Sequence, residues 1–596
     1  MNVDQEKAFD RVSHQYLSAV IRKYGFGENF QKWIKILNNN IYAKVLINGE
    51  LSSKIDIRRS VRQGCPLAPF LYVCVIETLL IKIRADKNII GIPSPSNYDR
   101  FLDVSFADDT NFLVTKIICL GIILSTFQKF GRASGSKTNS EKTEGMWLGS
   151  YVGRADEPFG INWVKTSKSL GIIYGSNNTN SLNWIPCFNK FKQSICYNLN
   201  RQVSLFGKAT ILNYIGYAKL WHKASALELP GNLCYDKDGL PVNIVEGINK
   251  YTLGFLWGFK EENSNNSRMA RIPKRSLLKI DTLFLQRSEG GVGLIDYQTK
   301  MKAFRILLVF KFLNQVDKHW KGILRYWYSA SLHQVSGERW NNNFPHISNI
   351  DEIPPYFRQC IIDFRHYYAL HRSDYNANIN SKIIYLNLMK DKNYHPITLS
   401  RFPGLNVKPY FQSLHNRKNL DPELKDFLFK LYHGRLYFKK YTTSLNDLLP
   451  SNRYNCIICN SSHDTPRHLF MNCRRGQLLR EKRNEIIDKF ANSSQLSDEN
   501  KIGCFFSENN IRVNTIALIL ILSNYTIYKF KMKKFYNPEE VISSIGIMQS
   551  FKSALKNRMI CDLKLYKREY FIQHWDPGGE HMICDYVDEK ITSWYF

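Results

Sequence analysis

Acidic residues at the ends of two apolar, strand-like runs constrain this chain more than any other feature of its sequence. They occur in Asp4-Gln5-Glu6-Lys7-Ala8-Phe9-Asp10 and again in Phe106-Ala107-Asp108-Asp109. Between them lies a basic segment punctuated by glycine and proline, Arg62-Gln63-Gly64-Cys65-Pro66-Leu67-Ala68-Pro69. Carboxylates that converge from separate strands can hold two divalent cations about 3.5–4 Å apart, as two-metal phosphoryl transfer requires. The three segments therefore predict a fold that brings residue 4 next to residues 108 and 109.

The residues around these segments predict an α+β fold with an antiparallel sheet. Apolar residues recur at helical spacing and predict helices over residues 16–24, 30–37 and 67–83. Asn48-Gly49 between two apolar runs is a strong signal for a β-hairpin. A second hairpin is predicted over residues 104–114, with Asp108 and Asp109 at its turn.

The composition indicates a folded protein with a polyanionic partner. The chain has 596 residues, which is too many for one hydrophobic core, and 44% of them are hydrophobic. Its 82 Lys and Arg residues exceed its 52 Asp and Glu residues, giving a formal net charge of +30. Such a charge favours a polyanionic partner, and the alternative is a merely soluble basic protein.

Several features argue against a membrane or secreted protein. The longest aliphatic run, Ile516 to Leu522, is far shorter than the ~20 residues that a membrane-spanning helix needs. The opening residues run straight into acidic ones and lack the pattern of a signal peptide. The 13 cysteines are an odd number and mostly scattered, which suits a reducing compartment better than a disulfide framework. We therefore expect an intracellular protein with no membrane partner.

The acidic residues also have ordinary alternatives. Asp108 and Asp109 can form a simple acidic hairpin turn, because aspartate favours turns. Asp4, Glu6 and Asp10 can mark a helix N-terminus, where acidic side chains are favourable. Mg²⁺ prefers a few carboxylates together with phosphate oxygens and water. Asp4 on one strand and Asp108-Asp109 on a neighbouring hairpin would supply such a set.

The palm motifs of reverse transcriptases resemble three segments of this chain: Asp-x-x-Lys-Ala-Phe-Asp, Arg-Gln-Gly-Cys-Pro-Leu-x-Pro and Phe-Ala-Asp-Asp. The likeness is greatest to those of non-LTR (long interspersed) retrotransposons. It implies that Asp4, Asp108 and Asp109 are the catalytic residues and hold two Mg²⁺ ions. It further implies RNA-directed DNA polymerase activity, with an RNA template, a DNA primer or target, and dNTPs as substrates.

The same resemblance implies a set of nucleotide-binding residues. Phe9 matches the aromatic residue that lies under the sugar and excludes a 2′-hydroxyl, although spacing alone favours a core phenylalanine. Gln63 and Gly64 match the turn that packs on the incoming nucleotide and the template, and Arg62 matches a phosphate contact. The alternative for this turn is a plain helix entry, with proline near the first helical turn.

A cluster of cysteine and histidine residues predicts a metal site near the C-terminal end of the chain. It reads Cys456-x2-Cys459-x8-His468-x4-Cys473, and three thiolates with one imidazole can complete a tetrahedral structural Zn²⁺ site. His463 is a competing ligand with a less suitable spacing. The alternative is three buried free cysteines and a surface histidine. Four protein ligands leave no open position, so the predicted role is structural.

The chain also resembles these retrotransposon proteins beyond the palm. Residues 134–142 resemble the next palm element, residues 168–171 the hairpin that grips the primer end, and residues 205–213 the thumb helix. The region around the cysteines resembles the zinc-binding domain that follows the thumb, and Arg467, Arg474 and Arg475 suit phosphate contacts. The implied domains are a palm over 1–155, a primer-grip hairpin and thumb over 156–230, a mostly helical connector over 231–420, and a zinc-binding and C-terminal helical domain over 421–596.

The start of the chain raises an alternative function. In the family a fingers region and an endonuclease precede the first acidic motif, whereas Met1 stands three residues before Asp4 here. We therefore expect the chain alone to polymerise weakly or not at all, as a truncated remnant that binds nucleic acid. A group II intron-type maturase fits the Phe-Ala-Asp-Asp motif and the Cys/His cluster less well. The resemblance places the protein in the nucleus during integration.

Overall fold

The computed structural model describes two compact units, which are treated separately below. The first comprises Met1–Lys190, Leu220–Gly247 and Met301–Tyr385, and the second comprises Phe191–Lys219, Ile248–Lys300 and Leu386–Phe596. The structure describes all residues apart from 94–99, 176–178, 232, 237, 261–271, 275, 315–326, 329–352, 372–378, 393, 395–407, 417–419, 439–453, 505–509, 567, 577–582 and 588–589.

A five-stranded sheet in the first unit carries the acidic motifs, with its strands in the order β11-β10-β1-β9-β8. The strands are β1 (Asn2–Val3), β8 (Asp103–Phe106), β9 (Asp109–Phe112), β10 (Glu144–Gly145) and β11 (Asn162–Trp163). Neighbouring strands are antiparallel, as predicted, except that β10 and β11 run parallel. The expectation of a wholly antiparallel sheet is therefore wrong at this edge. Residues 146–161 form the long crossover connection that a parallel pair needs.

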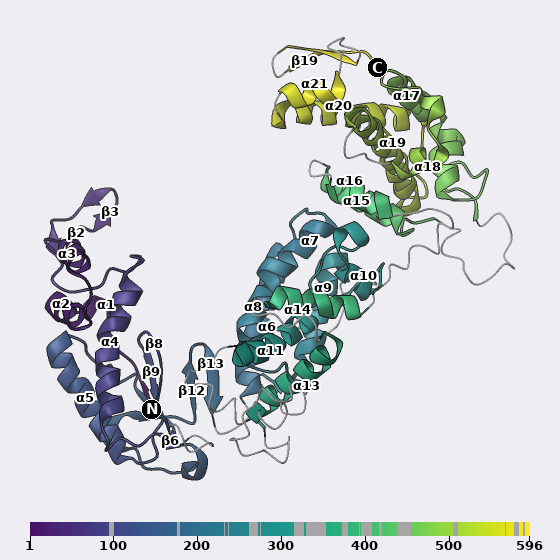
Figure 1. Ribbon diagram of the computed structural model, residues 1–596. Helices are drawn as coiled ribbons and strands as arrows, with labels where there is room; N and C mark the ends of the chain where they lie inside the picture. Colours follow the sequence, from purple (N-terminus) through teal and green to yellow (C-terminus); the bar gives the residue numbers. More distant parts are fainter. Residues whose placement is uncertain are drawn as a thin grey trace. The chain divides into compact units, whose positions relative to one another are not determined.

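Helices pack on this sheet and build its hydrophobic core. They are α1 (Ala8–Arg11), α2 (His14–Lys23), α3 (Glu28–Leu37), α4 (Ala68–Ala85) and α5 (Ile118–Ser134). Helix α4 has Pro69 in its first turn, and α5 ends at Gly135, whose φ of 82° favours glycine. Helices α2, α4 and α5 contact one another and bury apolar side chains together with Val3 and Phe112 of the sheet. Figure 1 shows α4 running beside β8 and β9.

The two predicted hairpins are present. Asn48 and Gly49, with φ of 50° and 90°, connect β3 (Leu46–Ile47) to β4 (Glu50–Leu51). Outside this pair, β2 (Tyr42–Ala43) pairs with β5 (Ile55–Asp56). In the second hairpin Phe106 lies opposite Asp109, so Ala107 and Asp108 form the turn. Asp109 is therefore the first residue of β9, not a turn residue as predicted, because the two-residue turn closes before it.

A smaller hairpin lies next to the sheet within the first unit. It consists of β12 (Thr166–Ser169) and β13 (Ile172–Gly175), joined by Leu170 and Gly171. Asn111 of β9 connects it to the sheet, because its amide donates to Ser169 Oγ at 2.9 Å and its carbonyl accepts from the Tyr174 hydroxyl at 3.0 Å. The segment predicted to grip a primer end is thus held against the strand that carries Asp109.

The remaining elements are mostly helical. The helices are α6 (Asn180–Asn198), α7 (Leu205–Ile211), α8 (Ala218–Ala224), α9 (Ile244–Trp257), α10 (Ile280–Phe284), α11 (Tyr297–Asn314), α13 (Pro355–Leu370), α14 (Ser381–Asp391), α15 (Lys408–Asn416), α16 (Pro422–Tyr432), α17 (Gln477–Asp488), α18 (Asp498–Gly503), α19 (Ile511–Tyr536), α20 (Ser544–Leu565) and α21 (Arg568–Trp575). The remaining strand pairs are β6 (Ile92–Pro93) with β7 (Arg100–Phe101), β14 (Cys234–Tyr235) with β15 (Pro241–Val242), β16 (Phe259–Lys260) with β17 (Ile272–Pro273), and β18 (Cys584–Val587) with β19 (Lys590–Trp594).

Helix α19 is the central helix of the C-terminal part of the second unit. It contacts α16, α17, α18, α20 and α21. Among the described helices, α19 is the one that is long and apolar enough to cross a membrane, judged by length and composition alone. However, 67% of its apolar window is buried inside the protein, and its buried face includes Asn524 and Lys531. These are the properties of a core helix.

Candidate active site and metal centre

The sheet brings the three predicted catalytic acids together. Strand β1 pairs with β9 so that Val3 lies opposite Thr110. Continuing this register by one residue places Asp4, which directly follows β1, opposite Asp109. Asp108 stands beside them in the β8–β9 turn. Opposed residues of antiparallel strands have Cβ atoms about 4.5–5.5 Å apart, a spacing at which two carboxylates can share cations.

Repulsion among these carboxylates shows in the pKa of Asp109. Partial burial raises this pKa above its usual value, and the neighbouring charges of Asp108 and Asp4 raise it further. Asp4 and Asp109 are half-buried, whereas Asp108 is exposed. Divalent cations at this point would relieve the repulsion, so the donor set and its electrostatics fit a Mg²⁺ site.

The turn that presents Asp108 has an unusual backbone. Ala107 has a φ of 52°, in the left-handed region that residues with a Cβ adopt at a cost. Backbone conformations of this kind cost on the order of 1–3 kcal/mol, and they cluster at functional sites. The pairing of β8 with β9 holds Ala107 in this conformation, and the turn then places Asp108 beside Asp109.

The segment around Lys137 fixes the backbone of the first motif. Asn139 N–H donates to the Asp4 carbonyl at 2.9 Å, and Glu6 N–H donates to the Lys137 carbonyl at 2.8 Å. The Glu6 carboxylate pairs with Arg11 at 2.6 Å and with Lys137 at 3.0 Å, and these partners lower its pKa. Glu6 is therefore neutralised within the motif by two cations, and it is not a free metal ligand.

The predicted nucleotide-binding residues lie beside the acids. Val61 N–H donates to the Phe9 carbonyl at 2.9 Å, which joins the first motif to the Arg62-Gln63-Gly64 turn. All three turn residues are exposed. Gly64 has a φ of 85° with open space around its Cα, so backbone conformation alone requires glycine here. The Arg62 guanidinium donates to the Leu37 carbonyl at 3.3 Å.

The four predicted zinc ligands converge in the second unit. One ligand atom from each of Cys456, Cys459, His468 and Cys473 lies within 4.8 Å of the other three. Tetrahedral coordination with Zn–S bonds of ~2.3 Å places ligand atoms about 3.8 Å apart, so this donor set fits zinc. His463 is exposed and does not belong to the cluster. The Cys-x2-Cys segment supplies two ligands, and the π-helix His468–Asn472 supplies the others as its first residue and as Cys473, which directly follows it.

The side chains of this cluster lie close enough to share protons in the metal-free protein. Hydrogen bonds with the Cys473 thiol and the His468 ring lower the pKa of Cys456. The neighbouring sulfur atoms of Cys456 and Cys459 raise the pKa of His468 in turn. Zinc binding requires deprotonated thiols and a neutral imidazole, so a bound zinc ion would displace these shared protons.

The surroundings of the cluster contain a contact that the sequence did not reveal. The Lys531 ammonium pairs with Asp464 at 2.9 Å, and both side chains are fully buried. The same ammonium lies 3.6 Å from the centre of the Phe438 ring. Asp464 stands between the two halves of the ligand set, so this contact anchors the zinc loop to α19. The residues are 67 positions apart in sequence, and no local pattern signals the pair.

The predicted phosphate contacts near the cluster differ from one another. Arg467 pairs with Asp498 at 2.8 Å, which occupies its guanidinium. Arg474 and Arg475 are exposed in the short 3₁₀ turn Arg474–Gly476 that follows the last ligand. The two arginines after Cys473 are therefore better placed for phosphate than Arg467.

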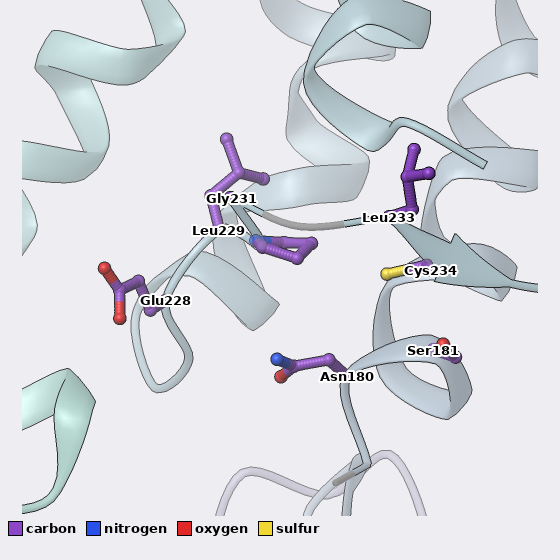
Figure 2. A pocket seen from close by; sticks show the side chains of 8 residues that line it. Asn180, Ser181, Glu228, Leu229, Gly231, Leu233 and Cys234 are labelled. Carbon is purple, nitrogen blue, oxygen red and sulfur yellow. The ribbon is translucent and has the colours of Figure 1, made fainter. Parts of the chain in front are cut away.

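A hollow of about 240 Å³ lies elsewhere in the first unit, at the start of α6. Figure 2 shows the loop from Glu228 to Gly231 on one side of it and Asn180 and Ser181 on the other. The Trp184 indole donates to the Glu228 carbonyl at 2.9 Å and fixes that loop. None of the predicted site residues lines this hollow.

Comparison with known proteins agrees with the geometry of the acids. Residues 1–181 match the family described as reverse transcriptase (RNA-dependent DNA polymerase). The chain is 26% identical over 323 residues to an uncharacterized 149 kDa protein of transposon TX1 from Xenopus laevis, covering 52% of this chain and 22% of that protein. It is 28% identical over 188 residues to a Pol polyprotein of a type-1 R2 retrotransposable element from Popillia japonica, covering 30% of each.

A Pol polyprotein of the type-2 element R2DM from Drosophila melanogaster is 27% identical over 141 residues, covering 24% of this chain and 13% of that protein. The chain thus spans less than a third of the length of each of these relatives. The family match covers both acidic motifs and the turn between them. Residues 1–181 are therefore a reverse transcriptase domain, with the palm-and-thumb polymerase fold that this implies, in a chain similar to the proteins of non-LTR retrotransposons.

Proposed function

We propose that this chain is the RNA-directed DNA polymerase of a non-LTR retrotransposon and extends a DNA primer along an RNA template with dNTPs. The observation that carries the proposal is the convergence of Asp4 with Asp108 and Asp109 at one end of the central strands. The family match over residues 1–181 supports the same activity.

In this proposal the acids hold two Mg²⁺ ions, which activate the attacking oxygen and stabilise the leaving group. The primer 3′-oxygen attacks the α-phosphorus of the dNTP, the bond to pyrophosphate breaks, and the hydroxyl proton passes to solvent. Asp4, Asp108 and Asp109 orient the reacting groups by fixing the cations. Their mutual repulsion in the metal-free protein favours cation binding.

The surrounding residues supply the nucleotide and primer contacts. Phe9 lies under the sugar of the dNTP, Gln63 and Gly64 pack on the nucleotide and the template, and Arg62 binds phosphate. The β12–β13 hairpin supports the primer end, because Asn111 ties it to the strand that carries Asp109. Leu170 at its tip is 44% exposed and has a φ of 47°, as a residue held ready for a partner would be.

We assign the Cys/His cluster one structural Zn²⁺ and its surface a role in holding nucleic acid. The buried ligand set leaves no open coordination position. Arg474 and Arg475 would contact phosphate independently of sequence.

Primer extension on an RNA template, with Mg²⁺ and dNTPs, tests the proposal. Any primer extension by the wild-type chain should be lost in the double variant D108A/D109A. Asp10→Ala is a matched control, because Asp10 is an exposed acid of the same motif outside the convergent set. Activity that survives D108A/D109A would overturn the assignment of the site.

The alternative function is nucleic-acid binding without polymerisation, favoured by the net charge of +30. It predicts that the wild-type chain binds a template–primer duplex yet adds no nucleotide. It also predicts that D108A/D109A binds that duplex no more weakly than the wild type does. Extension by the wild-type chain would exclude this alternative.

A further inference from the structure

The proposed sugar contact, Phe9, rests on a second aromatic ring. The rings of Phe9 and Tyr72 are stacked, with centroids 4.6 Å apart and an angle of 16° between their planes. Phe9 is half-buried in α1, whereas Tyr72 of α4 is only 1% exposed. One face of the Phe9 ring is thus covered by Tyr72, and this contact limits the directions in which the ring can turn.

Tyr72 is held in place by the hydrophobic core and lies near Asp108. Its neighbours Leu71 and Val75 on α4 are buried in the core that includes Val3 of the central strand. Burial raises the pKa of the Tyr72 hydroxyl, and the nearby Asp108 charge raises it further, so the group stays protonated. Tyr72 therefore lies against the Phe9 ring and near enough to Asp108 to feel its charge.

The polar atoms at this point lack hydrogen bonds of ordinary geometry among the described residues. They are the Tyr72 hydroxyl and both side-chain atoms of Gln5, the residue directly after Asp4. Gln5 is 6% exposed, and its amide approaches the hydroxyl closely enough to lower the pKa of Tyr72 slightly. The Tyr72 hydroxyl thus lies next to Gln5, the residue that directly follows Asp4.

We propose that Tyr72 is a positioning residue that holds the Phe9 ring across the sugar site and thereby sets the discrimination between dNTPs and rNTPs. The proposal deepens the proposed polymerase function and rests on it. The ring of Tyr72, not its hydroxyl, makes the contact with Phe9. Loss of the ring lets Phe9 tilt away from the sugar and admits a 2′-hydroxyl, whereas loss of the hydroxyl leaves the stack intact.

The test compares single-nucleotide incorporation of dGTP and GTP in five proteins: wild type, Y72F, Y72L, F9V and the double variant F9V/Y72L. For Y72L the ratio of kcat/KM for dGTP to that for GTP should fall about tenfold, since a small gain of space in a pocket has an effect of this size. Y72F should keep the wild-type ratio. In the F9V background, Y72L should change the ratio no further, because it acts through Phe9.

A matched control separates this effect from general loosening of the core. Phe130→Leu removes another core ring of the same domain, one whose centroid lies 5.8 Å from that of Tyr16. It should lower the unfolding temperature as Y72L does and leave the nucleotide ratio unchanged. If Y72L does not fold, Tyr72→Met takes its place, because its unbranched side chain has a similar volume and adapts to irregular gaps.

A binding measurement keeps this inference distinct from the proposed activity. Calorimetric titration of dGTP and GTP into each protein with a template–primer, with Ca²⁺ in place of Mg²⁺, measures the discrimination without bond formation. If the wild type binds dGTP more tightly than GTP but extends no primer, the proposed activity is contradicted. The ratio of the dGTP and GTP affinities in Y72L then still decides the role of Tyr72. An unchanged ratio in Y72L, or a wild type that binds both nucleotides equally or neither, overturns the inference.

Discussion

At the residue scale, the site combines groups that destabilise the metal-free fold. The Asp109 carboxyl is partly buried beside two further carboxylates, and its pKa is raised. A raised pKa means that the folded state binds the Asp109 proton more tightly than the unfolded state does. The contribution of Asp109 to stability therefore falls as the pH rises from below its unfolded pKa through its folded pKa, and the penalty is complete at neutral pH.

Asp109→Asn should consequently stabilise the metal-free protein at pH 7 while it abolishes polymerisation. The gain is less than about 1 kcal/mol, because water screens this partly exposed site. Thermal unfolding between pH 4 and pH 8, without divalent cations, measures the effect. The difference in unfolding temperature between D109N and the wild type should shrink as the pH falls toward 4.

Addition of Mg²⁺ provides the complementary measurement. It should raise the unfolding temperature of the wild type more than that of D109N, because binding to the folded state stabilises it. Asp10→Asn should respond to Mg²⁺ as the wild type does. A D109N protein that gains as much stability from Mg²⁺ as the wild type would contradict the assignment of Asp109 as a ligand.

At the scale of elements, the Cys/His cluster joins short pieces that would not hold together by themselves. The Cys-x2-Cys loop, the π-helix His468–Asn472 and the turn Arg474–Gly476 have few residues each. The buried ion pair between Asp464 and Lys531 connects this loop to α19. Breaking such a pair on one side costs about 3–5 kcal/mol, so the anchor matters to the local fold.

Cys456→Ser should remove zinc from the protein and destabilise the C-terminal region. Elemental analysis after dialysis should find one zinc ion per wild-type chain and a substoichiometric amount in the variant. Cys504→Ser is the matched control, because Cys504 is a buried cysteine of the same unit outside the cluster. A Cys456→Ser protein with unchanged zinc content would refute the predicted metal site.

At the scale of the whole molecule, the net charge of +30 favours binding to a polyanion, which is nucleic acid in our proposal. Affinity for a duplex should fall steeply with salt concentration, because each neutralised phosphate releases counterions. The exposed Arg474 and Arg475 belong to this surface in our proposal, whereas Arg467 is paired with Asp498.

The double variant R474A/R475A should therefore weaken binding to all sequences and reduce the slope of log K against log salt by about 2, close to one unit for each lost phosphate contact. Arg467→Ala should change this slope less than R474A/R475A does, because Arg467 is paired with Asp498. Fluorescence anisotropy of a labelled RNA–DNA duplex over a salt series provides the measurement. Equal slopes for the wild type and R474A/R475A would remove these residues from the interface.

Much of the first domain was predictable because its signals are local. Asn48-Gly49 specifies a tight turn through its backbone preferences, and the apolar run with Pro69 in its first turn specifies α4. The three acidic residues were recognised from motifs at fixed spacing, and the structure places them side by side. The assignment of Asp109 to the turn was wrong by one residue, because Phe106 pairs with Asp109 and the two-residue turn closes before it.

The sequence by itself determined the α+β class, the match of the first 181 residues to reverse transcriptases and the four members of the Cys/His cluster. Motif chemistry and helical or strand periodicity are properties of short segments, so a single chain is enough to read them. Tertiary structure alone decided the parallel pairing of β10 with β11, the stack of Tyr72 on Phe9 and the buried pair of Lys531 with Asp464. Each of these joins residues far apart along the chain, and the packing that selects them exists only after the chain has folded.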